Sequence, residues 1–222
     1  MYADHCVTQP RRRSNGNAVV DDVSFDKNIP CVVEKVNDGG HIVGSWGDTP
    51  AKTAWSFALL NTQQMDPALY REAMSRYAGH VQIVTTEFEG VRRGVTITAA
   101  CSVSDSPPSL LVCLNNTNDK NGVFFKSTHF AVNTLGLRHQ ELANAFAGFG
   151  GLSADERFAL GTWEKRVTGA PMLTDAIVSL DCRVTERVVT ATHTVLFGEI
   201  AAILFGPTDQ ALIYLDRGYR AL

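Results

Sequence analysis

Small and hydroxyl-bearing residues are concentrated between positions 94 and 109 of this 222-residue chain. The segment begins with β-branched residues typical of a strand and reaches two prolines, which cannot continue a sheet ladder. It carries six hydroxyl side chains: Thr96, Thr98, Ser102, Ser104, Ser106 and Ser109. Beside Ala99 and Ala100, such residues let the backbone approach a flat polar ligand and hydrogen-bond a phosphate without charge. The residue types alone fit an ordinary edge strand ending in a Ser/Pro loop at least as well.

Two other polar features have chemical potential. Residues 115–118 read Asn-Asn-Thr-Asn and precede a short predicted helix at 118–127, so amides and a helix N-terminus can hold an anion there. His193 stands between two threonines at a predicted strand start, and a histidine can bind a pyrophosphate or an amide in either charge state. Taken alone, a histidine in that setting is more often a surface or structural residue.

Several other chemistries have no support in the sequence. There is no Gly-x-Ser-x-Gly segment to indicate a hydrolase, and nothing near Cys101 marks it as an activated thiolate. The six histidines are scattered without metal-ligand spacing, so no metal site is predicted. No Gly-x-Gly-x-x-Gly follows a strand, which argues against a Rossmann domain.

Composition indicates one globular domain, with 45% hydrophobic and 19% charged residues. The net charge of -3 gives no electrostatic case for nucleic acid or an acidic membrane surface, and no apolar run is long enough for a membrane span. Five cysteines, an odd number without Cys-x-x-Cys, favour buried thiols in a reducing cytoplasm. We therefore expect a cytoplasmic protein.

The patterns predict a mainly β fold. Strands are expected near 81–86, 92–98, 109–114, 130–135, 177–189, 193–205 and 211–215, with a hairpin turn at Glu89-Gly90 and a helix N-cap near Ser153. In residues 177–189, clean alternation predicts that Ser179 and Asp181 face away from the buried side. A helix opening at Asp66-Pro67 has an apolar stripe, which we interpret as core packing. Short helices among hairpins favour a small antiparallel Greek-key barrel.

Residues 1–65 differ from the rest, because they contain only short apolar runs and no motif. They are either an extension that packs on the domain or on a second copy of it, or a dispensable segment preceding a natural start at Met65. We favour the second interpretation and expect residues 66–222 to form the functional domain.

The hydroxyl-rich segment and the motifs that follow it resemble the short-chain flavin reductases, the reductase components of two-component flavin-dependent monooxygenases. The resemblance spans about residues 66–222 in the family's order. It rests on residues 94–115, 130–135, 146–148, 155–158, 192–200 and 212–219. Within the family, the motifs are similar to the reductases of 4-hydroxyphenylacetate 3-monooxygenase and of pyrimidine utilisation. The resemblance implies the FMN-binding split barrel, usually a homodimer.

The resemblance also implies which residues bind the two nucleotides. The flavin site would comprise Thr96, Ile97, Thr98, Ala99, Ala100, Ser102, Val103, Thr117, Asn118, Lys120, Phe146, Ala147 and Gly148. The NAD(P)H site would comprise His193, Asp216, Arg217, Gly218 and Tyr219. His193 would position the nicotinamide, and no protein side chain would act as a nucleophile because hydride passes directly between the cofactors. Ala191 replaces the more usual glycine before this histidine.

The implied activity is reduction of FMN or FAD by NADH or NADPH, with the reduced flavin released to a separate oxygenase. The alternative is a non-catalytic flavin-binding protein on the same fold, acting as a store, sensor or electron-transfer module. A relative of pyridoxamine-phosphate oxidase shares the barrel, but the sequence has no basic substrate-phosphate cluster for it. NADH against NADPH stays open, since Arg92, Arg93 or Arg217 could each meet a ribose phosphate.

Overall fold

The computed structural model describes residues 31–36, 41–46, 55–58 and 65–222. The chain divides into two compact units, Met1–Asp66 and Pro67–Leu222. In the first, β1 (Cys31–Val36), β2 (His41–Trp46) and β3 (Trp55–Ala58) form an antiparallel sheet in that order. Among the short apolar runs of this segment, Cys31–Val33 thus belongs to a strand, whereas Ala18–Val20 lies outside the described residues.

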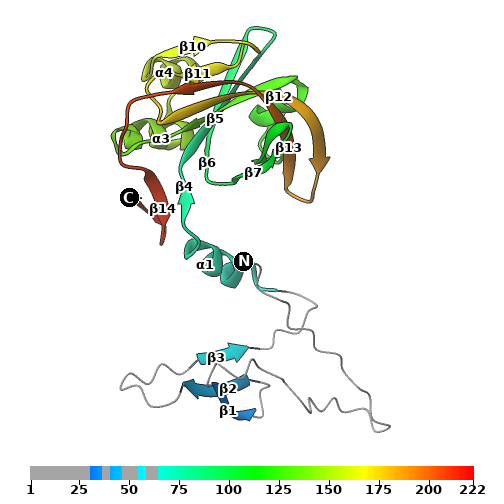
Figure 1. Cartoon of the computed structure of the whole chain (residues 1–222), viewed down its shortest axis with the longest axis vertical. Coiled ribbons are helices and arrows are strands. Elements are labelled where there is room, and N and C mark those ends of the chain that lie inside the picture. Colours follow the sequence, from blue (N-terminus) through cyan, green and yellow to red (C-terminus); the bar gives the residue numbers. More distant parts are fainter. Residues whose placement is uncertain (1–30, 37–40, 47–54, 59–64) are drawn as a thin grey trace. The chain divides into compact units, whose positions relative to one another are not determined.

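The second unit is built on a seven-stranded antiparallel sheet (Figure 1). Its strand order is β6-β5-β9-β12-β13-β8-β7. The strands are β5 (Gln82–Phe88), β6 (Val91–Ile97), β7 (Ala100–Asp105), β8 (Pro108–Asn115), β9 (His129–Thr134), β12 (Val178–Val189) and β13 (His193–Phe205). Each predicted strand of this sheet is present, and the Glu89-Gly90 turn joins β5 to β6 with both residues at positive φ.

Smaller elements surround this sheet. Two strand groups lie outside it: the pair β10 (Trp163–Lys165) and β11 (Pro171–Leu173), and the three-stranded sheet of β4 (Gly79–His80), β14 (Leu212–Leu215) and β15 (Gly218–Ala221). The α-helices are α1 (Pro67–Ser75), α2 (Gly122–Lys126), α3 (Gln140–Ala147) and α4 (Ala154–Ala159). The 3-10 turns are η1 (Asp119–Asn121), η2 (Leu137–His139) and η3 (Phe149–Gly151). The mainly β prediction with short peripheral helices is confirmed.

The sheet curls into a barrel that stays open along one seam. Strands β6 and β7 occupy opposite edges of the sheet, yet they are consecutive in the chain. The three peptide steps from Ile97 to Ala100 span at most about 11 Å, so the two edges must lie close together. No ladder joins β6 to β7 among the described strands. A closed-up but unpaired seam is the defining feature of a split barrel, as predicted.

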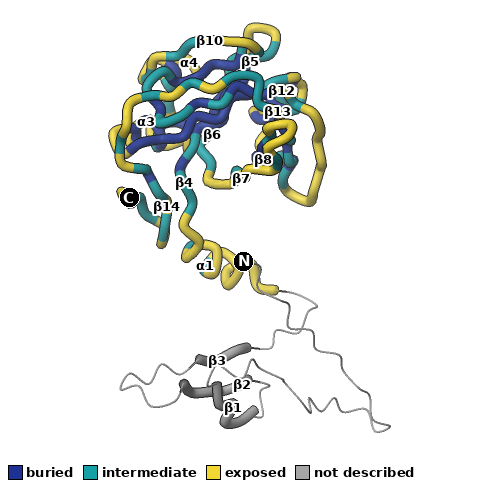
Figure 2. The backbone as a smooth tube through the Cα atoms, in the orientation of Figure 1, coloured by how far each residue is buried: buried dark blue, intermediate teal, exposed yellow. Residues whose placement is uncertain are grey.

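Two hydrophobic clusters lie on opposite faces of the sheet (Figure 2). Successive strand residues point to opposite faces, so Val84 contributes to the barrel interior and Ile83 to the outer cluster under α3 and α4. Phe124 and Phe130 fill the interior, where each is at most 1% exposed. The sheet is therefore covered on both sides where it supports α3.

The apolar stripe of α1 corrects one prediction. We expected Leu69, Tyr70 and Met74 to pack in the core, but α1 has no buried residue and these three side chains are 45–55% exposed. Helical spacing shows that an apolar face exists and not what covers it. In the isolated chain this face remains at the surface.

The predicted exposure of the polar face of β12 was also wrong. Ser179 and Asp181 were expected to face away from the core, yet both are fully buried. The segment around β11 covers this face, where Ser179 Oγ donates to Leu173 O at 2.9 Å. Asp181 accepts from the backbone N–H of Thr168 at 2.8 Å and from its hydroxyl. Burial is tolerated because these polar groups are hydrogen-bonded.

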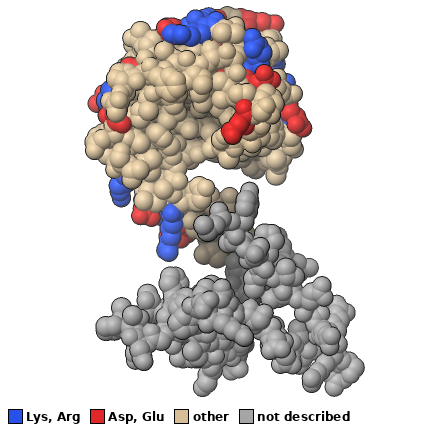
Figure 3. All heavy atoms as spheres, viewed as in Figure 1, with Lys and Arg blue, Asp and Glu red and all other residues tan. Residues whose placement is uncertain are grey.

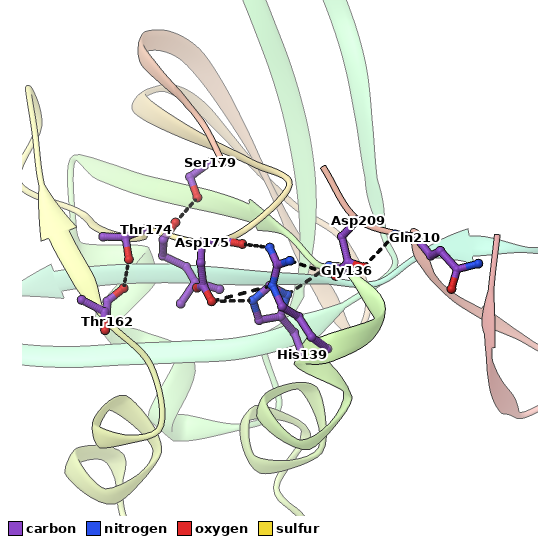
Figure 4. Close-up of polar contacts among 10 residues, drawn as sticks. Gly136, His139, Thr162, Thr174, Asp175, Ser179, Asp209 and Gln210 are labelled. Atoms are coloured by element: carbon purple, nitrogen blue, oxygen red, sulfur yellow. Dashed lines mark hydrogen bonds and ion pairs between the residues drawn. The ribbon is translucent and has the colours of Figure 1, made fainter. Parts of the chain in front are cut away.

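A polar cluster fixes the connection from β9 to α3 (Figure 4). The Nδ1 atom of the buried His139 accepts from Gly136 N at 3.1 Å, and its Nε2 lies 3.3 Å from Asp175 Oδ2. Arg138 reaches Asp209 at 3.4 Å from the same turn. Because these contacts tie η2 to the segments before β12 and β14, the start of α3 is held in place.

Charged side chains on the face shown in Figure 3 lie mainly around its rim, and the middle is largely uncharged. Among the described residues, no helix has the length and apolar character that a membrane crossing requires.

Candidate functional site

A cavity of about 390 Å³ gathers residues from widely separated segments. It lies at the barrel seam, where β6 leads into β7. Its lining includes Thr96, Ile97, Thr98, Ala99, Cys113, Asn115, Asn121, Ala147, Phe149, His193, Tyr214 and Tyr219. The structure thus brings the predicted flavin segment together with Ala147, His193 and Tyr219.

The polar backbone of the seam is available to a ligand. Thr98 and Ala99 lie between β6 and β7, outside both ladders, and both are exposed. The Ala99 carbonyl accepts from Cys113 N at 2.9 Å, which holds the seam against β8. Peptide groups that no ladder uses can donate to and accept from the polar edge of a flat ring.

The Thr96 hydroxyl has a structural partner. Its Oγ1 donates to the carbonyl oxygen of Ala143 in α3 at 2.8 Å. The bond ties the cavity-lining strand to the helix that carries Ala147. We infer that Thr96 shapes the cavity wall mainly through its position, since its hydroxyl proton is already engaged.

Phe146 supports the site from behind. It is 2% exposed and stacks edge-on against Phe158, with ring centroids 5.2 Å apart. A Cβ atom at Gly94 would lie 2.3 Å from this ring, so only glycine lets β6 approach α3 so closely. Phe146 therefore lies in the outer cluster and not in the cavity lining, whereas its neighbour Ala147 lines the cavity.

The chain leaves α3 through an unusual turn. Gly148 caps the helix at φ 103°, in the left-handed region, and Gly150 and Gly151 also have positive φ. Phe149, which lies between Gly148 and Gly150, is 67% exposed and lines the cavity. Gly148 thus contributes the turn that presents Phe149, a residue the sequence analysis did not single out.

The Asn-rich loop is organised by its own side chains. Asn115 Oδ1 accepts from the backbone N–H and the hydroxyl of Thr117 at 2.8 and 2.7 Å. Asn118 caps η1 by accepting from Lys120 N at 3.1 Å. Thr117, Asn118 and Lys120 are exposed and do not line the cavity, but the loop ends at Asn121, which does.

The continuation of the predicted flavin segment faces elsewhere. Ala100 and Ser102 line a separate cavity of about 450 Å³, along with Leu180 and Ile200 of the barrel. Val103 is 48% exposed. The structure therefore divides the predicted set between two cavities, with residues 96–99 in one and Ala100 and Ser102 in the other.

His193 enters the site from β13. It pairs in register with Asn115 of β8, and its Nδ1 lies 2.9 Å from the Thr192 hydroxyl. The imidazole is thus anchored on one side while the residue lines the cavity. This placement is compatible with a positioning role toward a ligand.

The C-terminal hairpin contributes aromatic rings and no cation. The rings of Tyr214 and Tyr219 contact each other, with centroids 5.6 Å apart. The pKa of Tyr219 is raised, mainly by its burial and secondly by the electrostatic effect of Tyr214. Arg217 instead pairs with Glu72 of α1 at 2.8 Å. Asp216 N donates to Ser75 O, and Gly218 opens β15. The hairpin turn thus docks on α1 while its tyrosines face the cavity.

Among the lining residues that were not predicted as site residues, four have an amide or aromatic side chain: Asn115, Asn121, Phe149 and Tyr214. Asn115 and Tyr214 lie within the family-like segments 94–115 and 212–219. Only that location in the sequence could have indicated a role in the site. Asn121 is 2% exposed, and a buried amide within a polar loop is recognisable only once its partners are known. Within the described part of the chain, no cluster of three metal-ligating side chains exists.

The residues present fit a flavin and a nicotinamide. The exposed backbone at the seam suits a polar ring edge, and three aromatic side chains that line the cavity with His193 offer flat faces for stacking. The cavity volume is within the range of small-ligand sites.

Comparison with known proteins agrees with this geometry. The family profile described as a flavin reductase like domain matches residues 74–222. The chain is 45% identical to an FMN reductase (NADH) of Methylorubrum extorquens over 158 residues, 71% of this chain and 76% of that protein. The fold is similar to a Haemophilus somnus protein assigned as a flavin reductase, with TM-score 0.68 and 39% identity, covering 71% of this chain and all of that one. The fold is also similar to that of flavin reductase PheA2, with TM-score 0.64 and 30% identity. This match covers 71% of this chain and 99% of PheA2.

Proposed function

Because the chain belongs to the flavin reductase like domain family, we propose that it is an NAD(P)H:flavin oxidoreductase that reduces FMN or FAD and releases the reduced flavin. The observation that carries the proposal is the seam cavity. It combines the exposed backbone of Thr98 and Ala99, which lies between the β6 and β7 ladders, with His193 and the tyrosine pair. The 45% identity to an FMN reductase (NADH) supports NADH as the reductant.

Hydride transfer is chemistry that the nicotinamide and flavin supply when both are bound. The protein's own residues bind and orient the rings. The backbone at Thr98 and Ala99 contacts the polar ring edge, Phe149 and Tyr219 contact flat faces, and His193 positions the amide or pyrophosphate. Peptide dipoles at the seam also favour negative charge on a reduced ring. No side chain has to act as a nucleophile.

We also propose that predicted site residues outside this cavity belong to the nucleotide sites. Ser102 and Val103 would meet the ribityl chain from β7, and Thr117, Asn118 and Lys120 would approach the phosphate from the loop. In this proposal Arg217 acts with NAD(P)H only after its ion pair with Glu72 opens.

The exposed face of α1 supports a homodimer. Leu69, Tyr70 and Met74 form an apolar stripe on α1 whose side chains are 45–55% exposed. A second copy is the occupant we propose, and light scattering during gel filtration tests it. A monomer at working concentration would contradict the dimer without affecting the reductase proposal.

The reduced flavin would serve a separate oxygenase in the cytoplasm. Flavin that leaves the protein needs an acceptor enzyme, since free reduced flavin reacts with oxygen. The free thiols of Cys101, Cys113 and Cys182 accord with a reducing compartment.

The test is NADH oxidation, followed by absorbance, with and without added FMN. A rate that rises and saturates with free FMN supports a reductase that treats flavin as a substrate. Tight flavin binding with no turnover of NADH or NADPH would contradict it and favour a non-catalytic flavin-binding protein. Substitution of NADPH and FAD in the same assay determines which nucleotides are preferred.

A further inference from the structure

Among the residues that the structure describes, no acidic group pairs with the positive charge of Arg93. Its Nε and Nη2 both donate to the neutral Oδ1 of Asn121, at 3.1 and 2.9 Å. The neighbouring Arg92 pairs instead with Asp155 at 2.9 Å. In the part of the chain that the structure describes, Arg93 makes no ion pair with a carboxylate. Arg93 is nevertheless partly buried.

Arg157 is a second arginine close to β6, because it belongs to α4, whose Asp155 pairs with Arg92 and whose Phe158 ring lies 4.7 Å from the Arg92 guanidinium. It is partly buried, and its Nε is shielded from solvent without a hydrogen-bond partner. Among the described residues it forms no ion pair either. Burial, followed by the positive charge of Arg157, lowers the pKa of Arg93. Two partly desolvated like charges are costly to keep together unless an anion offsets them.

Asn121 connects this charge to the seam cavity. Its Oδ1 accepts from Arg93, and its Nδ2 donates to Asn115 O at 2.8 Å. Asn121 and Asn115 both line the cavity. Arg93 therefore orients the Asn121 side-chain amide at one end of the cavity. Through its bond to Asn115 O, this amide joins the two ends of the Asn-rich loop.

We propose that Arg93, acting through Asn121 and together with Arg157, makes this end of the cavity selective for a nucleotide that carries a phosphate monoester. Arg93 is a positioning residue here, because it orients Asn121 and contributes charge without lining the cavity itself. A phosphate monoester carries up to two negative charges at neutral pH, which offsets the two guanidinium groups. The proposal rests on the proposed function and adds a selectivity to it.

Two ligands of the proposed reaction can present this group: FMN through its 5′-phosphate and NADPH through its 2′-phosphate. Riboflavin and NADH are the matched ligands that lack it. Comparing the two pairs shows which source is recognised.

The experiment uses the full chain and the variants Arg93→Gln, Arg93→Lys and Arg157→Gln. Arg92→Gln is the matched control, because it removes a neighbouring charge that Asp155 already neutralises. Dissociation constants for FMN and riboflavin come from quenching of flavin fluorescence, at low and high salt. Those for NADPH and NADH come from quenching of nicotinamide fluorescence. Thermal melting checks that each variant folds.

We expect Arg93→Gln to lower the preference for one phosphorylated ligand over its unphosphorylated match by about tenfold, the size of one charge-assisted contact. Riboflavin and NADH binding should change less than twofold. Arg93→Lys should retain part of the preference, and Arg157→Gln should also lower it, which keeps the test valid if Arg93→Gln fails to fold. The salt dependence of binding should weaken in parallel.

An equal loss for both members of each pair would mean that Arg93 only supports the loop, and the proposal would be overturned. An equal effect of Arg92→Gln would overturn it as well. If the preference shifts as expected but NADH is not oxidised, the proposed function fails while this inference stands. If NADH oxidation is intact and no preference shifts, the inference alone fails.

Discussion

The hydroxyl of Thr96 and the carbonyl oxygen of Ala143 are joined by a 2.8 Å hydrogen bond between β6 and α3. The bond links the strand that forms the cavity wall to the helix that ends at Ala147. It therefore couples two segments that are 47 residues apart in the chain.

Thr96→Val should weaken both stability and ligand binding. Valine has nearly the same shape but no donor, so the free energy of unfolding should fall by about 1 kcal/mol, a typical net value for one hydrogen bond. The dissociation constant for FMN should rise because α3 is less firmly held. Urea unfolding and flavin fluorescence measure the two effects. Thr96→Ser is the control and should preserve both, since it keeps the donor.

The three described thiols should react in a fixed order with iodoacetamide. Cys101 is exposed and should be modified first. Burial raises the pKa of Cys113, so less thiolate is present and reaction should be slower. Burial and Asp181 raise the pKa of Cys182 to about 12, so it should stay unmodified while the protein is folded. Peptide mapping by mass spectrometry reads each site separately.

Added FMN sharpens this experiment. Cys113 lines the seam cavity, whereas Cys101 lines the other one. Saturating FMN should therefore protect Cys113 and leave Cys101 reactive. Protection of Cys101 alone would place the flavin in the cavity beside β7 and contradict the site described above.

Features that are determined by residues close together in the sequence could be predicted from it. The Glu89-Gly90 turn and the capping box of α4 were predictable, because each is set by neighbouring residues. In the latter, Ser153 accepts from Glu156 N at 3.3 Å and its own N–H donates to Glu156 at 2.8 Å. Six of the seven strands in the main sheet were predicted from the residue pattern, but β7 was not predicted as a separate strand.

Features that depend on contacts between distant segments could not be predicted from the sequence. Burial of Asp181 depends on Thr168, and the role of Asn121 depends on Arg93, 28 residues away. The exposed stripe of α1 has the same cause, since periodicity cannot tell which surface will cover an apolar face. Residues 96–102 are divided between two cavities at the step from Ala99 to Ala100, where the chain enters β7, and the sequence does not mark that boundary.

Acid should destabilise the protein through His129. Burial is the main cause that lowers the pKa of His129 below its ordinary 6.5, although Asp181 and Glu87 oppose it. The folded state then binds a proton less readily than the unfolded state, so stability is complete above about pH 6.5 and falls as pH decreases below it. Thermal melting across this range measures the decline. His129→Gln should flatten the curve between neutral and mildly acidic pH, and an unchanged slope would assign the acid sensitivity to other groups.

Removing residues 1–64, so that the chain starts at Met65, should leave the reductase domain folded and active. The unit Pro67–Leu222 contains both large hydrophobic clusters, and its ladders pair only with one another among the described strands. Its melting temperature and its saturation by FMN should therefore match those of the full chain. The α1 stripe makes this a real test, because α1 belongs to the retained unit and its apolar face is exposed there. Aggregation of the shortened chain, with recovery when the extension is restored, would show that residues 1–64 are part of the working protein. Full activity with an unchanged oligomeric state would instead establish the segment as dispensable.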